Sequence, residues 1–98
     1  MLVALICFDK PGAEALRAET RASHLDYVRA SGPMVRIAGP FQSDDGARMI
    51  GSLIVLECET LERAREWAAN DPYAKAGLFA ETRIHPWRFV IENGAPRA

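Results

Sequence analysis

The sequence begins with the apolar run Leu2-Val3-Ala4-Leu5-Ile6-Cys7-Phe8, which stops at Asp9-Lys10-Pro11-Gly12. A run of this length, rich in β-formers and followed by turn residues, predicts a strand. A second run, Leu53-Ile54-Val55-Leu56, is apolar at four successive positions. Strands with one solvated face alternate apolar and polar residues, so both runs indicate strands that are buried on both faces.

Between these runs, the pattern predicts one long helix and two strands that form a hairpin. The residues at 13–30 favour a helix that ends at Ser31-Gly32-Pro33. Its predicted inward stripe consists of Ala15, Ala18, Ala22, Leu25 and Val28. Residues 34–38 predict a strand closed by Gly39-Pro40, and a turn at 42–46 leads into a strand at about 48–58.

After the second apolar run, the pattern predicts another helix and a last strand. Thr60 is placed to cap a helix that runs to Asn70, with Leu61, Ala64 and Ala68 facing inward. Asp71-Pro72 resembles a helix cap followed by proline, and it opens one or two turns that end near Gly77. Residues 80–91 predict a long strand bent around Pro86, and residues 93–98 predict a frayed tail.

This order of elements, βαββαβ, predicts one ferredoxin-like α+β domain over residues 1–98, with an antiparallel sheet and a flexible tail at about 94–98. We expect the first and third strands to be central, parallel neighbours, and the two helices to run in the same direction over one face. Two helices cannot cover both faces of the sheet. A homodimer formed through the other face is therefore expected, and the alternative is a monomer with a partly apolar surface.

The composition excludes several classes of partner. Twelve basic and thirteen acidic side chains give a net charge of -1, without the basic face that nucleic acids require. The first apolar run is too short for a membrane span and lacks the basic start of a signal peptide, so we expect a cytoplasmic protein. Cys7 and Cys58 are expected to be buried, inert thiols. The sequence contains no metal-spaced ligand set, P-loop or dinucleotide motif, so no metal or cofactor is expected.

Two residues are candidates for acid–base chemistry. His24 falls at the edge of the apolar stripe of the first helix, beside Arg17 and Arg21, and Asp71 follows the second helix. In the expected topology these places lie close together. A carboxylate that accepts the imidazole N–H would fix the tautomer of a general base. The alternatives are a histidine that packs at the core boundary and an aspartate that only caps a helix.

The remaining candidates are weaker. His85 precedes Pro86-Trp87 without an acidic partner, which is typical of a structural histidine. Ser52 follows Gly51 but lacks the surrounding pattern of a nucleophile elbow. Tyr73 is more typical of the core or of a dimer contact, although it can also form the wall of an apolar pocket.

Several short motifs occur together along almost the whole chain. They are Arg21-x-x-His24-Leu25-x-Tyr27, Ala38-Gly39-Pro40, Gly51-Ser52-Leu53, Asn70-Asp71-Pro72-Tyr73, Gly77-Leu78-Phe79 and Pro86-Trp87. In this order and spacing they resemble the YCII-related (YciI-like) family. The resemblance implies a ferredoxin-like fold that dimerises through its sheets, related to the dimeric α/β barrels. It also implies an active site built on a histidine and an aspartate, which correspond here to His24 and Asp71.

The leading hypothesis is a cofactor-independent enzyme that acts on a small cyclic or carbonyl-bearing metabolite by proton transfer, elimination or isomerisation. In this interpretation His24 is the general base or acid and Asp71 orients it, while Arg21 holds an anionic group. Gly39, Pro40, Ser52 and Tyr73 line the edge of the pocket. The alternatives are a small-molecule-binding or interaction module without turnover, and a haem-handling dimer in which His24 binds the iron.

Overall fold

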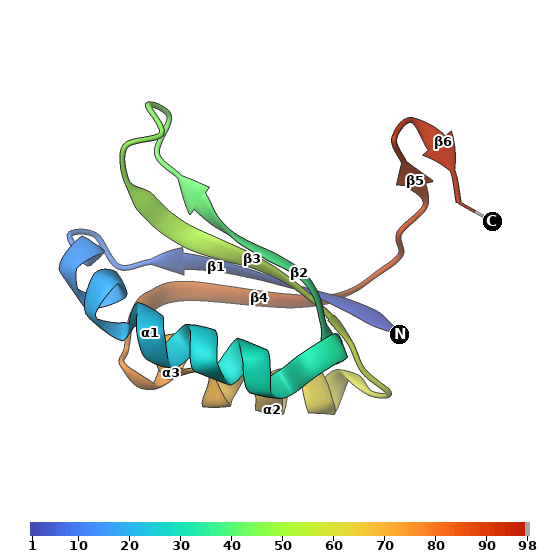
Figure 1. Cartoon of the computed structure of the whole chain (residues 1–98), viewed down its shortest axis with the longest axis horizontal. Coiled ribbons are helices and arrows are strands. Elements are labelled where there is room, and N and C mark those ends of the chain that lie inside the picture. Colours follow the sequence, from blue (N-terminus) through green and yellow to red (C-terminus); the bar gives the residue numbers. More distant parts are fainter. Residues whose placement is uncertain (98) are drawn as a thin grey trace.

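The computed structural model describes residues 1–97; Ala98, the last residue of the predicted tail, lies outside the described residues. Along the chain the elements are β1 (Leu2–Asp9), α1 (Glu14–Ser31), the 3-10 turn η1 (Gly32–Met34), β2 (Val35–Gln42), β3 (Met49–Glu57), α2 (Leu61–Asn70), α3 (Pro72–Lys75), β4 (Phe79–Trp87), β5 (Ile91–Glu92) and β6 (Ala95–Pro96). The predicted βαββαβ order is confirmed, and a short hairpin follows it (Figure 1).

Strands β1 to β4 form one sheet in the order β2-β3-β1-β4. β1 pairs antiparallel with β3 and β4, and β2 pairs antiparallel with β3. The fold is therefore the expected ferredoxin-like α+β fold with an antiparallel sheet. The prediction that the first and third strands are parallel is wrong. The chain returns through α1 to run β2 in the direction of β1, and the β2–β3 hairpin then reverses it before β3 pairs with β1.

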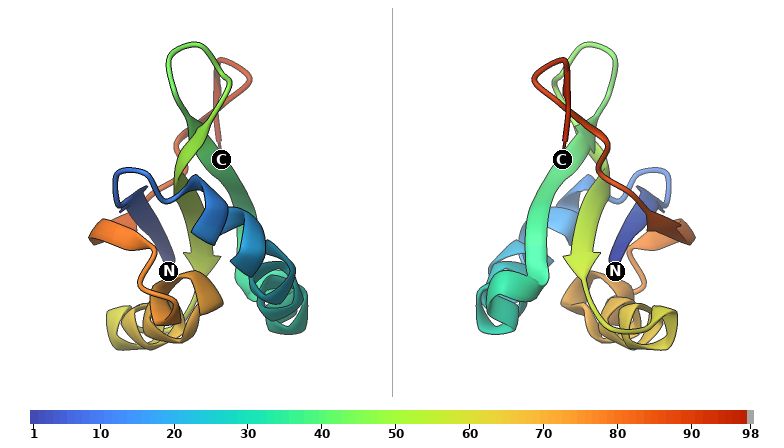
Figure 2. Two further views of the ribbon diagram at one scale, coloured as in Figure 1. Left: turned by 90° about the vertical axis from the view of Figure 1, so that its left-hand side faces the viewer. Right: turned by 90° about the vertical axis from the view of Figure 1, so that its right-hand side faces the viewer.

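The two long helices lie side by side on one face of the sheet and run in opposite directions (Figures 1 and 2). The prediction of a shared direction is wrong for the same reason, because each helix reverses the strand before it and β1 is antiparallel to β3. The core between helices and sheet contains Val3, Leu5, Ile54, Leu56, Ala64 and Trp67. Thr60 caps α2 as predicted, by accepting the backbone N–H of Arg63 at 3.1 Å.

The face that α1 turns toward the sheet is more polar than predicted. Its buried residues are Arg17 and His24, whereas Ala15, Ala18 and Ala22 are exposed. The inward stripe predicted from the alanines is therefore wrong. Alanine buries little apolar area, while a buried arginine or histidine is tolerated where a carboxylate meets it.

Both edge strands contain a proline. β2 continues through Gly39-Pro40, where the sequence predicts its end. β4 continues through Pro86 but ends at Trp87, short of the predicted residue 91. Edge strands accept proline because one of their sides needs no N–H for the ladder. β5, which precedes the predicted tail, pairs as a short hairpin with β6, which lies inside it.

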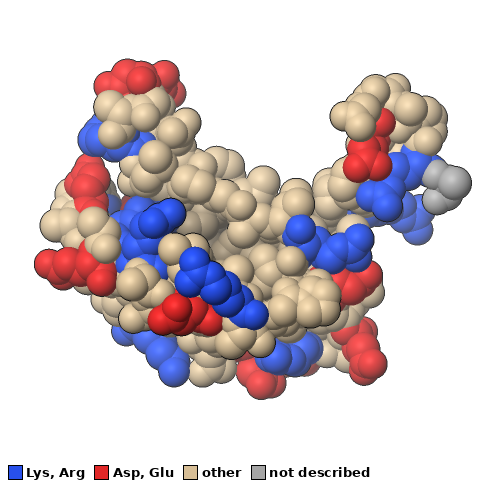
Figure 3. Space-filling view, in the orientation of Figure 1, with Lys and Arg blue, Asp and Glu red and all other residues tan. Residues whose placement is uncertain are grey.

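The other face of the sheet is covered by no helix of residues 1–97 (Figure 2). Side chains alternate along a strand, so Ile6 and Leu53 point to this open face while Leu5 and Ile54 point to the core. Phe8 and Phe41 stack at one end, with ring centroids 5.2 Å apart. The β2–β3 hairpin and the C-terminal segment rise on this side, and uncharged surface lies between them (Figure 3).

Both cysteines are free and buried, as predicted. Burial raises the pKa of the Cys7 thiol from 9.0 to about 11. Separately, none of the helices within residues 1–97 has the length and apolar character needed to cross a bilayer.

We expect iodoacetamide at mildly alkaline pH to leave Cys7 unmodified in the folded protein. A pKa raised from 9.0 to about 11 lowers the reactive thiolate fraction about a hundredfold. Cys58→Ser leaves Cys7 as the sole thiol, and mass spectrometry with and without denaturant measures its alkylation. Modification of native Cys7 at the rate seen in denaturant would contradict the buried position.

Candidate active site

A buried hydrogen bond joins His24 of α1 to Asp71, the residue between α2 and α3. His24 Nδ1 lies 2.8 Å from Asp71 Oδ1, and the two side chains are 10% and 3% exposed. An ionised carboxylate only accepts hydrogen bonds, so Nδ1 carries the proton and donates it. Nε2 of the neutral ring is then an unprotonated base. The two residues predicted to lie together are therefore in contact.

The same carboxylate oxygen caps α3. Asp71 Oδ1 accepts the backbone N–H of Tyr73 at 2.9 Å, and Pro72 occupies the first helical position. The cap predicted from the Asp71-Pro72 sequence is thus confirmed. Because one oxygen receives both hydrogen bonds, the cap also fixes where the carboxylate meets the imidazole.

A second buried carboxylate holds Arg17. Its Nε donates to Asp9 Oδ2 at 2.7 Å and its Nη2 donates to Asp9 Oδ1 at 2.9 Å. Nη2 also donates to Ser52 Oγ at 2.9 Å. Burial alone would lower the pKa of the Arg17 guanidinium, but the hydrogen bonds and the charge of Asp9 raise it above its usual value. The guanidinium is therefore charged and held at three points.

Tyr73 packs against both His24 and Arg17. Its ring stacks on the imidazole, with centroids 4.1 Å apart and planes 16° apart. Arg17 Cζ lies 4.6 Å from the centroid of the same ring. Burial raises the pKa of the Tyr73 phenol, against the opposing charges of Arg17 and Arg21. The hydroxyl consequently remains protonated near neutral pH and can donate a hydrogen bond.

These groups face a cleft of about 750 Å³ between α1 and the β2–β3 hairpin. All the binding residues predicted from the sequence line it, namely Arg21, Gly39, Pro40, Ser52 and Tyr73. His24 lines it as well, whereas Asp71 lies behind the imidazole. His85 is exposed on β4 opposite Ala4, outside this cleft.

Two buried residues of this site, Asp9 and Arg17, are not singled out by the sequence. Arg17, Arg21 and His24 follow one another at helical spacings of four and three residues, and this spacing is the signal that identifies Arg17. Asp9 carries no comparable signal, because it reads as the polar residue that ends the first strand.

Two nitrogen atoms of the site reach the surface of the cleft. Within residues 1–97, no buried side-chain nitrogen or oxygen lacks a hydrogen-bond partner. Neither His24 Nε2 nor Arg17 Nη1 takes part in the side-chain hydrogen bonds formed by these residues. Both atoms are therefore accessible from the cleft, which both residues line.

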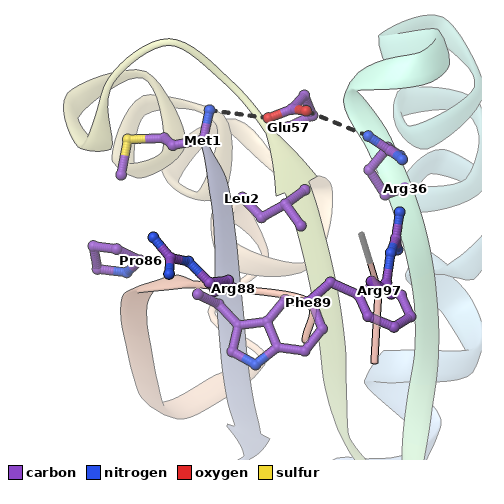
Figure 4. Close-up of a pocket in the computed structure, with 9 residues that line it drawn as sticks. Met1, Leu2, Arg36, Glu57, Pro86, Arg88, Phe89 and Arg97 are labelled. Carbon is purple, nitrogen blue, oxygen red and sulfur yellow. Dashed lines mark hydrogen bonds and ion pairs between the residues drawn. The ribbon is translucent and has the colours of Figure 1, made fainter. Parts of the chain in front are cut away.

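A second pocket of about 680 Å³ lies beside the N-terminus and the end of β4, lined by Met1, Leu2, Arg36, Glu57, Pro86, Trp87, Arg88, Phe89 and Arg97 (Figure 4). Glu57 pairs with the Met1 amine at 3.0 Å and with Arg36 at 3.3 Å. Arg97 stacks on Phe89 at 4.2 Å. None of its lining residues is buried, so it lacks the fixed polar groups of the first cleft. Nor do residues 1–97 place three His, Cys, Asp or Glu side chains for a metal ion.

The fold and the site define a small ferredoxin-like α+β protein with a buried His–Asp pair facing a cleft. The sequence model of the YCII-related domain matches residues 1–88, and the chain belongs to this family. Protein YciI of Escherichia coli is 31% identical, over 93% of this chain and all of that protein. The resemblance predicted from the sequence is confirmed.

Two solved structures have a similar fold. 5-Chloro-2-hydroxyhydroquinone dehydrochlorinase (TftG) from Burkholderia phenoliruptrix AC1100, in complex with 2,5-dihydroxybenzoquinone, matches with a TM-score of 0.82 and 32% identity. The match covers 90% of this chain and 94% of that enzyme. Rv0793 from Mycobacterium tuberculosis matches with a TM-score of 0.58 at 15% identity, covering 95% of this chain and 99% of its own; this second likeness concerns the fold alone.

Substitution of Asp71 separates its cap from its contact with His24. Asp71→Ser keeps an oxygen that can cap α3, whereas Asp71→Ala removes it, so we expect the alanine variant to be less stable by about 0.5–2 kcal/mol. Urea unfolding followed by circular dichroism measures the difference. Thr60→Ser and Thr60→Ala provide the matched pair at the cap of α2. Equal losses in both Asp71 variants would show that the contact with His24, and not the cap, stabilises this junction.

Proposed function

We propose that this protein is an enzyme that transfers a proton to or from a small cyclic or carbonyl-bearing metabolite, with His24 as the general base or acid and Asp71 as its orienting partner. The observation that carries the proposal is the buried hydrogen bond from Nδ1 to Asp71, which leaves Nε2 at the cleft. A general base positioned in this way supplies a factor of about 10²–10⁴. The similarity to TftG, whose substrate and ligand are small rings, supports this class of reaction.

In the proposed reaction, Nε2 takes a proton from a carbon next to a carbonyl of the bound ring. The electron pair of the broken C–H bond forms an enolate, and Asp71 stabilises the imidazolium that results. In an elimination, the enolate electrons return and expel a leaving group as an anion, and the imidazolium releases its proton to solvent. In an isomerisation, the imidazolium returns its proton to a different carbon. No electrons pass to or from the protein, so the proposed reaction requires no cofactor.

The cleft volume of about 750 Å³ lies within the range of small-molecule sites. We propose that Arg21, Gly39, Pro40, Ser52 and Tyr73 contact the substrate there. A cytoplasmic location is also proposed, because the thiols of Cys7 and Cys58 are free and reducing compartments keep thiols in this form.

Deuterium exchange tests the proposed chemistry without requiring the natural substrate. The probe is 2,5-dihydroxybenzoquinone. Its ring carbon takes up a deuteron from the deuterated imidazolium, which gives a CHD group next to a carbonyl, and Nε2 then takes the proton of this group to restore the ring. In D₂O we expect the protein to accelerate loss of the ring protons from the NMR spectrum, and His24→Ala to reduce the acceleration about 10²–10⁴-fold.

Asp71→Ser should reduce the same exchange rate while the fold persists. The double variant His24→Ala/Asp71→Ser should exchange no more slowly than His24→Ala, because residues that act as a unit are not additive. Binding of the quinone without exchange in the parent protein would favour the rival hypothesis, a binding module without turnover. An exchange rate that is unchanged in His24→Ala would show that His24 is not the base.

We further propose that two copies associate through the open sheet face. On this face Ile37 is 54% exposed, Trp87 is 42% exposed and Phe8 is 39% exposed. An apolar surface of this kind is typical of a protein interface. The proposed interface is isologous, because each copy offers the same face.

Light scattering at micromolar concentration should report about twice the mass of one chain. Leu53→Glu places a charge in the middle of the open face, where its burial in a dimer costs several kcal/mol, so this variant should be monomeric. Ala22→Glu adds the same charge on the exposed side of α1 and serves as the matched control. A monomeric parent protein would refute the proposed interface.

A further inference from the structure

We propose that Arg17, Ser52 and Tyr73 form a subsite for a negatively charged oxygen of the substrate, and that Asp9 positions this subsite. The ligand class that fits is a planar ring with an acidic hydroxyl or an enolate oxygen next to a carbonyl. This inference rests on the proposed function, because it concerns the substrate of the same cleft. It assigns the directional anion contact to Arg17, instead of Arg21.

The hydrogen bonds of Arg17 leave one part of its guanidinium for a ligand. A guanidinium has five N–H donors. The single donor of Nε is used by Asp9, and Nη2 donates to Asp9 and Ser52. The two donors of Nη1 are left over, and this nitrogen is accessible from the cleft. Asp9 therefore holds the guanidinium in an orientation that presents Nη1 to a ligand.

Two hydroxyl groups lie beside the same guanidinium, those of Ser52 and Tyr73. The oxygen of Ser52 accepts from Arg17, so its own proton is free to donate. Ser52 is 4% exposed and Tyr73 is 3% exposed, which means that only a small part of each reaches the cleft. The Tyr73 phenol stays protonated for the reason given above and is a second neutral donor. Such donors, fixed before the ligand arrives, are what stabilises an oxyanion.

Tyr73 also sets the position of the subsite relative to the base. The His24 imidazole stacks on its ring at 4.1 Å, and the Arg17 guanidinium lies 4.6 Å from the same ring centroid. The base and the anion donors are thus held by one side chain. In an enolisation the negative charge develops on an oxygen two bonds from the carbon that loses the proton, so a base and an oxyanion subsite must be adjacent.

Charge distinguishes the contributions of the two arginines. The charge of Arg17 is matched at short range by Asp9, at 2.7 and 2.9 Å, so Arg17 acts through directed hydrogen bonds. Arg21 lines the cleft but is exposed, so it attracts anions through a field that salt screens. Removal of Arg21 should therefore weaken anion binding only at low salt, whereas removal of the Arg17 contact should weaken anion binding at any salt concentration.

Equilibrium binding of two probes tests the subsite. 2,5-Dihydroxybenzoquinone is an anion near neutral pH, and 1,4-dihydroxybenzene is a neutral ring of similar size. Arg17→Met should weaken binding of the quinone anion about tenfold or more, because hydrogen bonds to charged groups are strong. Binding of the neutral ring should change little. Arg29→Met removes an exposed arginine from the same helix and is the matched control.

Arg17→Met leaves the Asp9 carboxylate buried without its partner and can fail to fold. Tyr73→Phe and Ser52→Ala avoid this problem, because each removes one hydroxyl and leaves the ion pair intact. Each should lower the affinity for the quinone anion several-fold, both at low salt and at about 0.5 M salt. Arg21→Met should lower this affinity at low salt but not at high salt. Unchanged anion affinity in Tyr73→Phe and Ser52→Ala would overturn the subsite, as would equal losses for the neutral ring.

The same titrations separate this inference from the proposed reaction. Quinone binding should survive His24→Ala, although deuterium exchange should not. If the parent binds the quinone through Tyr73 and Ser52 without exchanging its protons, the reaction is refuted and the subsite stands. If exchange depends on His24 but substitution of Arg17, Ser52 or Tyr73 leaves quinone binding unchanged, the subsite is refuted and the reaction stands. Absence of binding to the parent at millimolar quinone would refute the ligand class.

Discussion

Two buried carboxylates determine how α1 sits on the sheet. Asp9, at the end of β1, pairs with Arg17, and Asp71, at the end of α2, pairs with His24. Arg17 and His24 are seven residues apart, so the helix is attached at two points that are two turns apart. Loss of Asp9 or of Arg17 would leave an unpaired buried charge, which destabilises a protein by about 3–5 kcal/mol. The polar side of α1 therefore contributes to the fold as well as to the cleft.

The same carboxylate oxygen contributes to the stability of the fold and to the geometry of the site. Asp71 Oδ1 receives the N–H that begins α3 and the N–H of the imidazole. α3 in turn carries Tyr73, whose ring supports both the imidazole and the guanidinium. A shift of the short helix would move the base and the anion donors together. Because these side chains support one another, the positions of the imidazole and the guanidinium are set before a ligand binds.

The sequence predicts the elements better than their arrangement. The apolar runs, the Thr60 cap and the Asp71-Pro72 cap are local signals, and each is found where it is predicted. Strand direction is not a local signal, and the predicted parallel pair is antiparallel. His24 and Asp71 meet although the predicted helix directions are wrong. The helices are antiparallel, and in this arrangement the end of α2 lies beside the middle of α1. The contact is therefore formed, but for a different reason from the one predicted.

The predicted inward face of α1 is wrong because polar residues are buried there. Alanines spaced along one stripe indicate an inward face, but Arg17 and His24 occupy it instead. A hydrophobicity pattern cannot identify a buried arginine, because its burial depends on a carboxylate from another element of the fold. The partner of Arg17 is eight residues away and that of His24 is 47 residues away. Neither pair can be predicted without the topology.

The edge strand β2 connects the cleft to the open face. Its side chains alternate, so Pro40 lies opposite Ser52 on the side of the cleft, while Phe41 stacks on Phe8 on the open face. A partner copy on the open face would press against one side of the strand whose other side forms the wall of the cleft. Edge strands have a partner on one side only, and so they move more easily than central strands. Association of two copies would therefore be linked to the width of the cleft through this strand, even though no residue of the His–Asp pair lies on the open face.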